Sequence, residues 1–288
     1  MSQPLPLLSE GKSSGDLFNR RRVFELSLAR KAPNRKAYYR RRGIFDKNLY
    51  SPASMGYDRV PTTFSPDGKL YQVDYALEAV KKGWITLGIK ASDGIVLAVE
   101  KKRYTRLIDP AYTEKIFKID DHIGAVFAGL SPDARFLIDQ ARVYGQIYKL
   151  VYDEPVDVET LTRYICDIMH DYTLHGGARP FGVSLMIGGV FRGQPKLYGT
   201  DPGGAYAGYF ANAIGSGFST VMDYLEKNYD EKALLDDAIV LALKAMAPVV
   251  EGGLASGNFE LAVVPVKTGL FEKLSQEKVM SYVEKAKS

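Results

Sequence analysis

The order of the expected strands and helices constrains the fold of this chain more than any other feature. From Met55 onward, strand-like stretches come in hairpin runs, and each run of strands is followed by a pair of helix-like stretches. Strands that alternate singly with helices would favour a parallel sheet, whereas hairpin runs favour mostly antiparallel sheets. We therefore expect an α+β protein with a four-layer αββα sandwich, in which two mostly antiparallel sheets face each other between helix pairs.

Local turn and capping signals place these elements. Residues 84–102 are predicted as two strands around a Ser-Asp-Gly turn, and residues 115–129 as a second hairpin that turns near Asp120. Ser131-Pro132-Asp133 is typical of a helix start, and Asp157 opens a second helix that reaches about Tyr172. Further strands are expected at 182–191, 195–201, 205–215 and 259–266, and further helices at 219–229, at 232–252 and from Ser275.

The segment before the first hairpin has its own organisation. Ser65 to Gly68 forms a turn signal with Pro66 at its second position. Apolar residues then follow one face of a helix between Leu70 and Lys82, and Gly83 supplies the stop. We therefore divide the ordered part of the chain into residues 55–83, a turn and an N-terminal helix, and residues 84–288, the sandwich domain.

Residues 1–54 read differently from the rest. They hold twelve Lys and Arg against four Asp and Glu, a net charge of +8, so the remaining residues carry −4 of the total of +4. Prolines and basic clusters interrupt any periodicity, which indicates a flexible basic extension. Two readings stay open: a nucleic-acid-binding arm, and an over-long start, because Met55 stands directly before the ordered pattern. We favour an extension that does not bind nucleic acid.

Several classes of protein are excluded by residue usage. Cys166 is the only cysteine, so no internal disulfide forms, and its place on an apolar helical stripe indicates a buried thiol. The three histidines, His122, His170 and His175, lack metal-ligand spacing, so we expect no metal and no cofactor. There is neither a run of about 18 apolar residues nor a leader peptide, so we expect a cytoplasmic protein that does not enter a membrane.

Four segments of the chain are specific enough to compare with a known family: residues 57–83, 113–135, 177–185 and 213–220. They resemble the corresponding segments of proteasome α-type subunits, in the order in which that family has them, and look most like the archaeal type. The resemblance covers roughly residues 55 to 285, and residues 1–54 lie outside it. It implies the N-terminal-nucleophile hydrolase sandwich, and a seven-membered α ring stacked on β rings in the 20S core. It also implies four partners: other α subunits, β subunits, a hexameric ATPase activator, and unfolded proteins that pass the pore.

The alternative function is a catalytic threonine peptidase subunit of the same fold. Such β-type subunits use an N-terminal threonine whose free amine serves as the base. The resemblance places Trp84 at the threonine position, with Glu100 and Lys115 at the supporting acid and lysine positions. A helix precedes Trp84, so no free amine forms there, and the other candidate threonines are poorly placed: Thr62, Thr63 and Thr86. We therefore expect a structural and gating subunit without catalytic residues.

The Tyr-Asp-Arg sequence that opens the resemblance is not a catalytic motif. The resemblance implies that Tyr57, Asp58 and Arg59 from seven copies crowd around the pore and form a gate. Charge-assisted bonds suit Asp58 and Arg59, and packing over the opening suits Tyr57. Pro66 then sets the direction in which the leading segment leaves the body, and Tyr75 can pack with Tyr57. The alternative is that this sequence only caps the fold.

A second site is implied around Lys115. In the family the matching lysine lies in a pocket between adjacent α subunits and receives the C-terminal carboxylate of an activator. Gly129, before Leu130, lets that peptide come close, because it has no side chain. Asp74 stands where the family more often has Glu and borders the same region. The alternative for Lys115 is an exposed lysine at a strand edge.

Overall fold

A computed structural model describes residues 56, 59–60, 62–101, 107 and 114–287. The predicted basic extension, residues 1–54, lies outside the described residues, as do Tyr57 and Asp58 of the predicted gate. Within the described part of the chain, no helix has the length and apolar character that crossing a bilayer needs.

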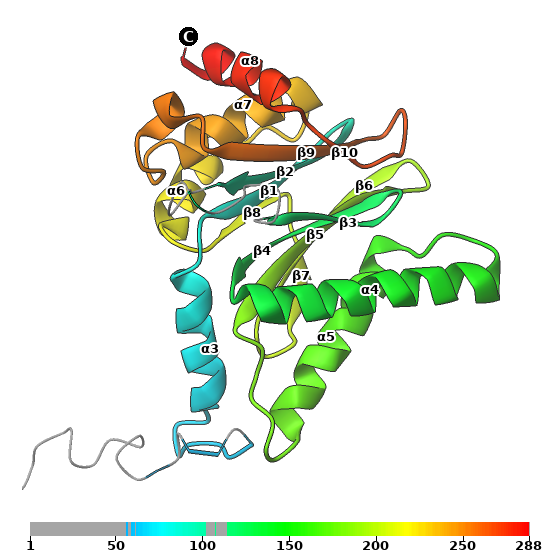
Figure 1. The fold of residues 1–288 in the computed structure, drawn as a ribbon, viewed down its shortest axis with the longest axis vertical. Helices are drawn as coiled ribbons and strands as arrows, with labels where there is room; N and C mark the ends of the chain where they lie inside the picture. Colours follow the sequence, from blue (N-terminus) through cyan, green and yellow to red (C-terminus); the bar gives the residue numbers. More distant parts are fainter. Residues whose placement is uncertain (1–55, 57–58, 61, 102–106, 108–113, 288) are drawn as a thin grey trace, which may run out of the picture. The chain divides into compact units, whose positions relative to one another are not determined.

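Two five-stranded sheets form the centre of the fold (Figure 1). The first has the order β10-β9-β2-β1-β8 and the second the order β3-β4-β5-β6-β7, and neighbouring strands pair antiparallel. The first sheet consists of β1 (Thr86–Ala91), β2 (Gly94–Glu100), β8 (Ala211–Ile214), β9 (Phe259–Pro265) and β10 (Glu272–Lys273). The second consists of β3 (Ile116–Asp120), β4 (Ile123–Gly129), β5 (Val183–Phe191), β6 (Gln194–Thr200) and β7 (Tyr206–Gly208).

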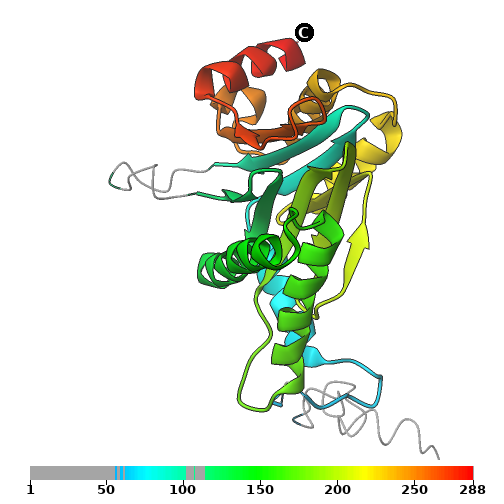
Figure 2. The same ribbon diagram turned by 90° about the vertical axis from the view of Figure 1, so that its right-hand side faces the viewer.

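Helices cover the outer face of each sheet, so the predicted four-layer sandwich is confirmed. The second sheet carries α4 (Ser131–Tyr152) and α5 (Val158–Leu174). The first sheet is covered by α7 (Leu235–Met246) and α8 (Gln276–Lys287), with α6 (Phe218–Asn228) beside β8 and α7. Figure 2 shows the two sheets between the green helices α4 and α5 and the yellow-to-red helices of the other side.

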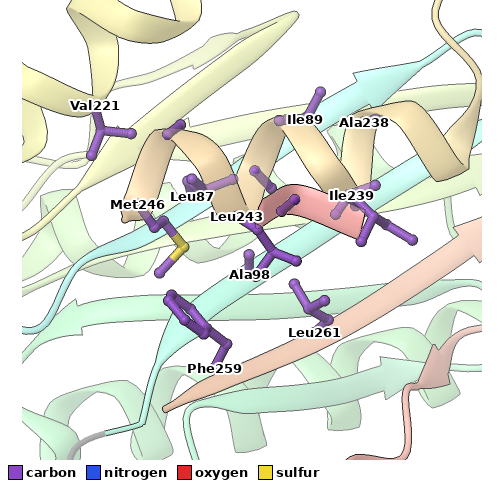
Figure 3. Packing of buried hydrophobic residues seen from close by; sticks show 14 of the residues in the cluster. Leu87, Ile89, Ala98, Val221, Ala238, Ile239, Leu243, Met246, Phe259 and Leu261 are labelled. Atoms are coloured by element: carbon purple, nitrogen blue, oxygen red, sulfur yellow. The ribbon is translucent and has the colours of Figure 1, made fainter. Parts of the chain in front are cut away.

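Apolar side chains fill the three spaces between these layers. One cluster joins the first sheet to α7, where Leu87, Leu243 and Leu261 are fully buried (Figure 3). A second joins the other sheet to α4 and α5, and a third lies between the sheets around Leu97 and Met186. Burial of this kind supplies most of the driving force for folding, at about 25 cal/mol per Å² of apolar surface.

The hairpin predictions are confirmed, but one strand prediction is corrected. Ala91 pairs with Gly94 around the first turn, and the β3–β4 register shifts between Lys118 and Asp120. Residues 205–215, predicted as one strand, form β7 in the second sheet and β8 in the first. The break falls at Tyr209, whose N–H donates to Leu197 of β6, and Phe210, whose carbonyl accepts from Lys90 of β1. Two consecutive residues therefore bond to different sheets.

The helix α3 (Tyr71–Lys81) connects the leading segment to the sandwich, and it is drawn in cyan in Figure 1. It packs against β4 and β5 and ends just before β1. A Cβ added to Gly83 would lie 2.4 Å from the backbone nitrogen of Gly129. The end of α3 and the end of β4 are therefore in direct backbone contact, which only glycine permits.

Candidate functional site

Trp84 stands at the junction of α3 and β1, and its backbone is fixed there. The N–H of Ser216 donates to the carbonyl of Gly83 at 2.7 Å. A Cβ on Gly215 would lie 2.5 Å from the Trp84 oxygen. The glycine-rich segment at 215–217 therefore packs closely against this junction, where the chain runs on from helix to strand. Trp84 accordingly carries a peptide nitrogen and not the free amine that a threonine peptidase needs.

Lys115 lies directly before β3 and is buried, with only 8% of the residue exposed. Its Nζ lies 4.4 Å from the centre of the Trp84 ring and 5.1 Å from that of Phe127. Burial lowers the pKa of Lys115 from 10.5 to about 8, and the carboxylate of Glu100 opposes that shift. The alternative of an exposed strand-edge lysine is therefore wrong.

The structure thus brings together the three residues that the resemblance placed at catalytic positions, and among the residues that it describes, an indole stands at the position of the nucleophile. Glu100, at the end of β2, is 8% exposed and acts electrostatically on Lys115. The hydroxyl of Thr86 is buried and donates to the carbonyls of Phe127 at 3.1 Å and Trp84 at 3.3 Å. Thr62 and Thr63 are exposed ahead of the turn. What remains is an ammonium between two aromatic faces, a group suited to hold an anion.

Gly129 and Leu130 follow shortly after Phe127, one of the two aromatic residues that face this ammonium. Gly129 ends β4, two residues after Phe127, and has φ +116°, a conformation that side chains rarely adopt. Leu130 follows it and is 44% exposed, so its side chain is accessible next to the site. Gly129 and Leu130 therefore follow the strand segment that carries Phe127, and a docking site that they share with Lys115 stays a prediction.

The last residue of the predicted docking site, Asp74, stands near the start of α3, whereas Trp84 follows the end of that helix. Asp74 lies in the first turn of α3, on a partly buried position. At 1.5 Å per residue, its Cα lies roughly 10 Å along the helix axis from that of Lys81 at the other end. A contact between Asp74 and an activator stays a prediction. It would require a pocket that two neighbouring copies of the chain form together.

The turn that follows the predicted gate forms as expected. The N–H of Gly68 donates to the carbonyl of Ser65 at 2.8 Å, and Gly68 has φ +73°. Pro66 is exposed in this turn, and the buried Ser65 hydroxyl accepts from the N–H of Lys69 at 3.1 Å. The role of Ser65 was not predicted, although a serine at the first position of a turn often bonds its own backbone.

The described gate residues lie around the start of α3. Arg59 is exposed and lines a cavity of about 440 Å³ together with Val60, Gln72 and residues 176–179. Tyr75 is 46% exposed and its ring lies 6.3 Å from that of Tyr71, an interaction that sequence reasoning missed. Its predicted contact with Tyr57 lies outside the described residues.

Sequence reasoning also missed the pair of Asp133 and Arg179. Asp133 lies in the first turn of α4, as the predicted helix start implies, but Ser131 is the first helical residue and not its cap, and α4 has no side-chain cap bond. Instead, Arg179 binds both oxygens of Asp133, at 2.7 and 2.8 Å. These residues are 46 positions apart, and only the tertiary fold brings them together.

Other polar groups have structural roles. Burial raises the pKa of Cys166 to about 12, so its thiol stays protonated and unreactive at neutral pH, as its apolar stripe predicted. The Nε2 of His122 bonds the carbonyl of Val156 at 2.8 Å. In the part of the chain that the structure describes, no three His, Cys, Asp or Glu side chains gather as metal ligands would.

Comparison with known proteins adds to this geometry. A family model described as "Proteasome subunit" matches residues 80–264, and a second model, for the N-terminal signature of α-type proteasome subunits, matches residues 57–79. The proteasome α subunit of Sulfurisphaera tokodaii is 49% identical over 239 residues, 82% of this chain and 99% of the relative. The proteasome α subunit of Saccharolobus islandicus is also 49% identical, over 238 residues, 82% of this chain and 99% of the relative. That of Sulfolobus acidocaldarius is 49% identical over 237 residues, 81% of this chain and 98% of the relative.

Proposed function

Because this chain belongs to the proteasome subunit family, as a non-catalytic α-type subunit of the 20S core, we propose that it forms a seven-membered outer ring that gates the entry of substrates. In this proposal Tyr57, Asp58 and Arg59 line the opening, Pro66 sets the direction of the leading segment, and Tyr75 packs with Tyr57 when the gate is open. Unfolded proteins pass this gate in the cytoplasm to active sites on β subunits. A hexameric ATPase opens the gate by inserting its C-termini beside Lys115.

The observation that carries the docking proposal is the environment of Lys115. Its ammonium lies between the rings of Trp84 and Phe127 and is shielded from water. A carboxylate that reaches it would be attracted more strongly than in bulk solvent, because the effective dielectric constant is lower there. Trp84 is only partly buried, so the rim of the site meets solvent. Leu130 and Gly129 offer the adjoining surface for a terminal peptide, and Asp74 would contact it from another copy.

Electron microscopy of the chain, expressed with and without a β subunit, tests the ring. We expect annular particles with seven-fold symmetry, and stacked particles when β subunits are present. Peptide hydrolysis should appear only in the stacked particles. If the purified chain stays as single protomers with every β subunit and salt concentration tried, the ring proposal fails.

An apolar stripe on α4 supports assembly with other proteasome subunits. Val143, Ile147 and Leu150 recur at helical spacing, and 54%, 52% and 85% of each is exposed. Large apolar side chains that gather on one exposed helix face mark a surface for a partner. We therefore assign this stripe to an interface with another subunit of the core.

The stripe gives an assembly prediction. Leu150→Glu should leave the fold intact, because the side chain is mostly exposed, but should prevent formation of the stacked particle, because a charge would be buried in the interface. Leu270→Glu is the matched control, since Leu270 is a 55% exposed leucine outside the stripe. Size-exclusion chromatography with β subunits provides the measurement. Equal assembly of the two variants would contradict the assignment.

Docking should also depend on pH. Binding a carboxylate requires the ammonium form of Lys115, whose pKa of about 8 is lowered by burial. Above that pH the free chain must take up a proton to bind, so we expect the affinity for the activator to fall by up to about tenfold for each further pH unit. Binding measured from pH 7 to 9.5 at constant ionic strength tests this. In Lys115→Arg, which does not titrate there, the slope should disappear; a flat profile for the unmodified chain would exclude Lys115 as the docking group.

A further inference from the structure

We propose that Arg179 is a positioning residue that couples activator docking beside Leu130 to the segment that carries Arg59. This inference rests on the proposed gating function and adds a connection between its two sites. The connection runs through Asp133 and Gly182, and no motif in the sequence indicates that these two residues bond to each other.

The first link is the bond between Arg179 and Asp133. Nη1 and Nη2 of Arg179 donate to the two oxygens of Asp133 at 2.7 and 2.8 Å. The N–H of Gly182 donates to the same carboxylate at 2.8 Å. Burial alone would raise the pKa of Asp133, but these hydrogen bonds outweigh it and lower the pKa. The pair is therefore ionised at neutral pH, and Asp133 fastens the loop before β5 to the first turn of α4.

The second link joins Gly182 to the docking surface. The N–H of Leu130 donates to the carbonyl of Gly182 at 2.9 Å. A Cβ on Gly129 would lie 2.2 Å from that carbonyl oxygen, and a Cβ on Gly182 would lie 2.8 Å from the Leu130 side chain. The backbones of these residues are in contact without spare space. A ligand that displaces Leu130 must therefore displace Gly182 as well.

The third link joins Arg179 to the gate segment. Its side chain is 60% exposed and lines the cavity of about 440 Å³ that Arg59 and Gln72 also line. Two guanidinium groups in one cavity repel each other unless one of them is neutralised. Asp133 neutralises Arg179 as long as their bonds hold. Gly176 and Gly177 have no neighbour within 4 Å of an added Cβ, so this part of the loop has room to move.

Together these contacts make a two-state element. With the Asp133 bonds intact, Arg179 is neutralised and Arg59 keeps its place in the cavity. When docking moves Leu130, Gly182 and Asp133 move with it, and the charge presented to Arg59 changes. Docking therefore biases the position of the gate segment through a difference in electrostatic energy between the two states.

Arg179→Ala in the assembled complex with β subunits tests the inference. We measure the dissociation constant of the hexameric proteasomal ATPase and, at saturating ATPase, the ratio of stimulated to basal degradation. We expect the dissociation constant to stay within about twofold of the parent value and the ratio to fall about fivefold or more, the lower range of typical coupling. Arg179→Lys, which keeps the charge but loses the paired bonds, should restore the ratio only in part.

The controls separate coupling from stability and from docking. Arg192→Ala removes another exposed arginine that pairs with a carboxylate, Glu154, at 2.8 Å, and should change nothing. If Arg179→Ala leaves the ratio of stimulated to basal degradation unchanged, the inference is overturned. It is also overturned if the ratio falls only in proportion to a loss of ATPase affinity and of thermal stability. If Arg179→Ala does not assemble, Arg179→Gln is measured for the same quantities. Lys115→Ala in parallel distinguishes the proposals: if it too leaves stimulation intact, the docking proposal itself fails.

Discussion

Replacing Lys115 with methionine is expected to abolish ATPase-stimulated degradation while the rings still assemble. Methionine fills a similar volume between Trp84 and Phe127 but offers no charge to a terminal carboxylate. Because the docking energy depends on that charge, stimulation should fall to the basal level, whereas basal peptide hydrolysis should persist. Degradation of an unfolded protein, with and without the ATPase, provides the measurement.

Lys118→Met is the matched control for this substitution. Lys118 lies on the strand that Lys115 precedes, but its side chain is 52% exposed and pairs with Asp121. It should retain full stimulation. Undiminished stimulation in Lys115→Met, in particles that bind the ATPase normally, would remove Lys115 from the docking site.

The same variant reports the energetic cost of the buried ammonium. The pKa of Lys115 is lowered in the folded chain, from 10.5 to about 8. Below about pH 8 both states are protonated and the folded state bears the full cost of burying the charge. Between about pH 8 and 10.5 the folded state loses its proton while the unfolded chain keeps it, so the free energy of unfolding rises with pH. At about 1.4 kcal/mol for each pKa unit, the total rise is on the order of 3 kcal/mol.

Urea unfolding of both chains across this pH range isolates that rise. Other lysines and tyrosines also titrate there, so the quantity of interest is the difference between the unmodified chain and Lys115→Met. The unmodified chain should gain stability relative to the variant from pH 8 to 10.5. A constant difference would mean that Lys115 is not held at a lowered pKa.

The elements of this fold were predictable where local signals set them. The Ser-Asp-Gly turn and the Ser65–Gly68 turn both stand where glycine and proline preferences put them. The change of sheet at Tyr209 and Phe210 was not predicted, because Gly208, which precedes it, is also compatible with a continuous strand, and only the distant strands β6 and β1 bond to these two residues. Local patterns carry no information about such partners.

The candidate site divides in the same way. The resemblance indicated Lys115, Gly129 and Leu130; Gly129 and Leu130 follow Phe127, whose ring faces Lys115, and their common role stays a prediction. The burial of Lys115 follows from Trp84 and Phe127. The predicted hairpin over residues 115–129 already brings Phe127 close to Lys115, whereas the packing of the Trp84 ring against Lys115 depends on the tertiary fold. The bond of Arg179 to Asp133 was hidden for the same reason, since the two residues are 46 positions apart and Asp133 also suits the start of a helix.

Gly129→Ala is expected to be the most destabilising single-methyl substitution at this site. The added Cβ would lie 2.2 Å from the carbonyl oxygen of Gly182, and the residue has φ +116°. If Gly182 retreated alone, it would strain or break the bonds of its N–H to Asp133 and of its carbonyl to Leu130. We expect a loss of about 4 kcal/mol or more in the free energy of unfolding, or failure to fold.

Gly177→Ala separates the steric part of this loss from the backbone part. Gly177 also has a positive φ, +87°, but an added Cβ there would meet nothing within 4 Å. It should therefore cost only about 1–2 kcal/mol, the usual cost of a left-handed backbone for a residue with a side chain. Urea unfolding of the two variants under identical conditions gives both values. If Gly129→Ala lowers the free energy of unfolding no more than Gly177→Ala does, the contact between Gly129 and the carbonyl of Gly182 is looser than in the structure. A displacement of Leu130 would then not be passed on to Asp133 and Arg179.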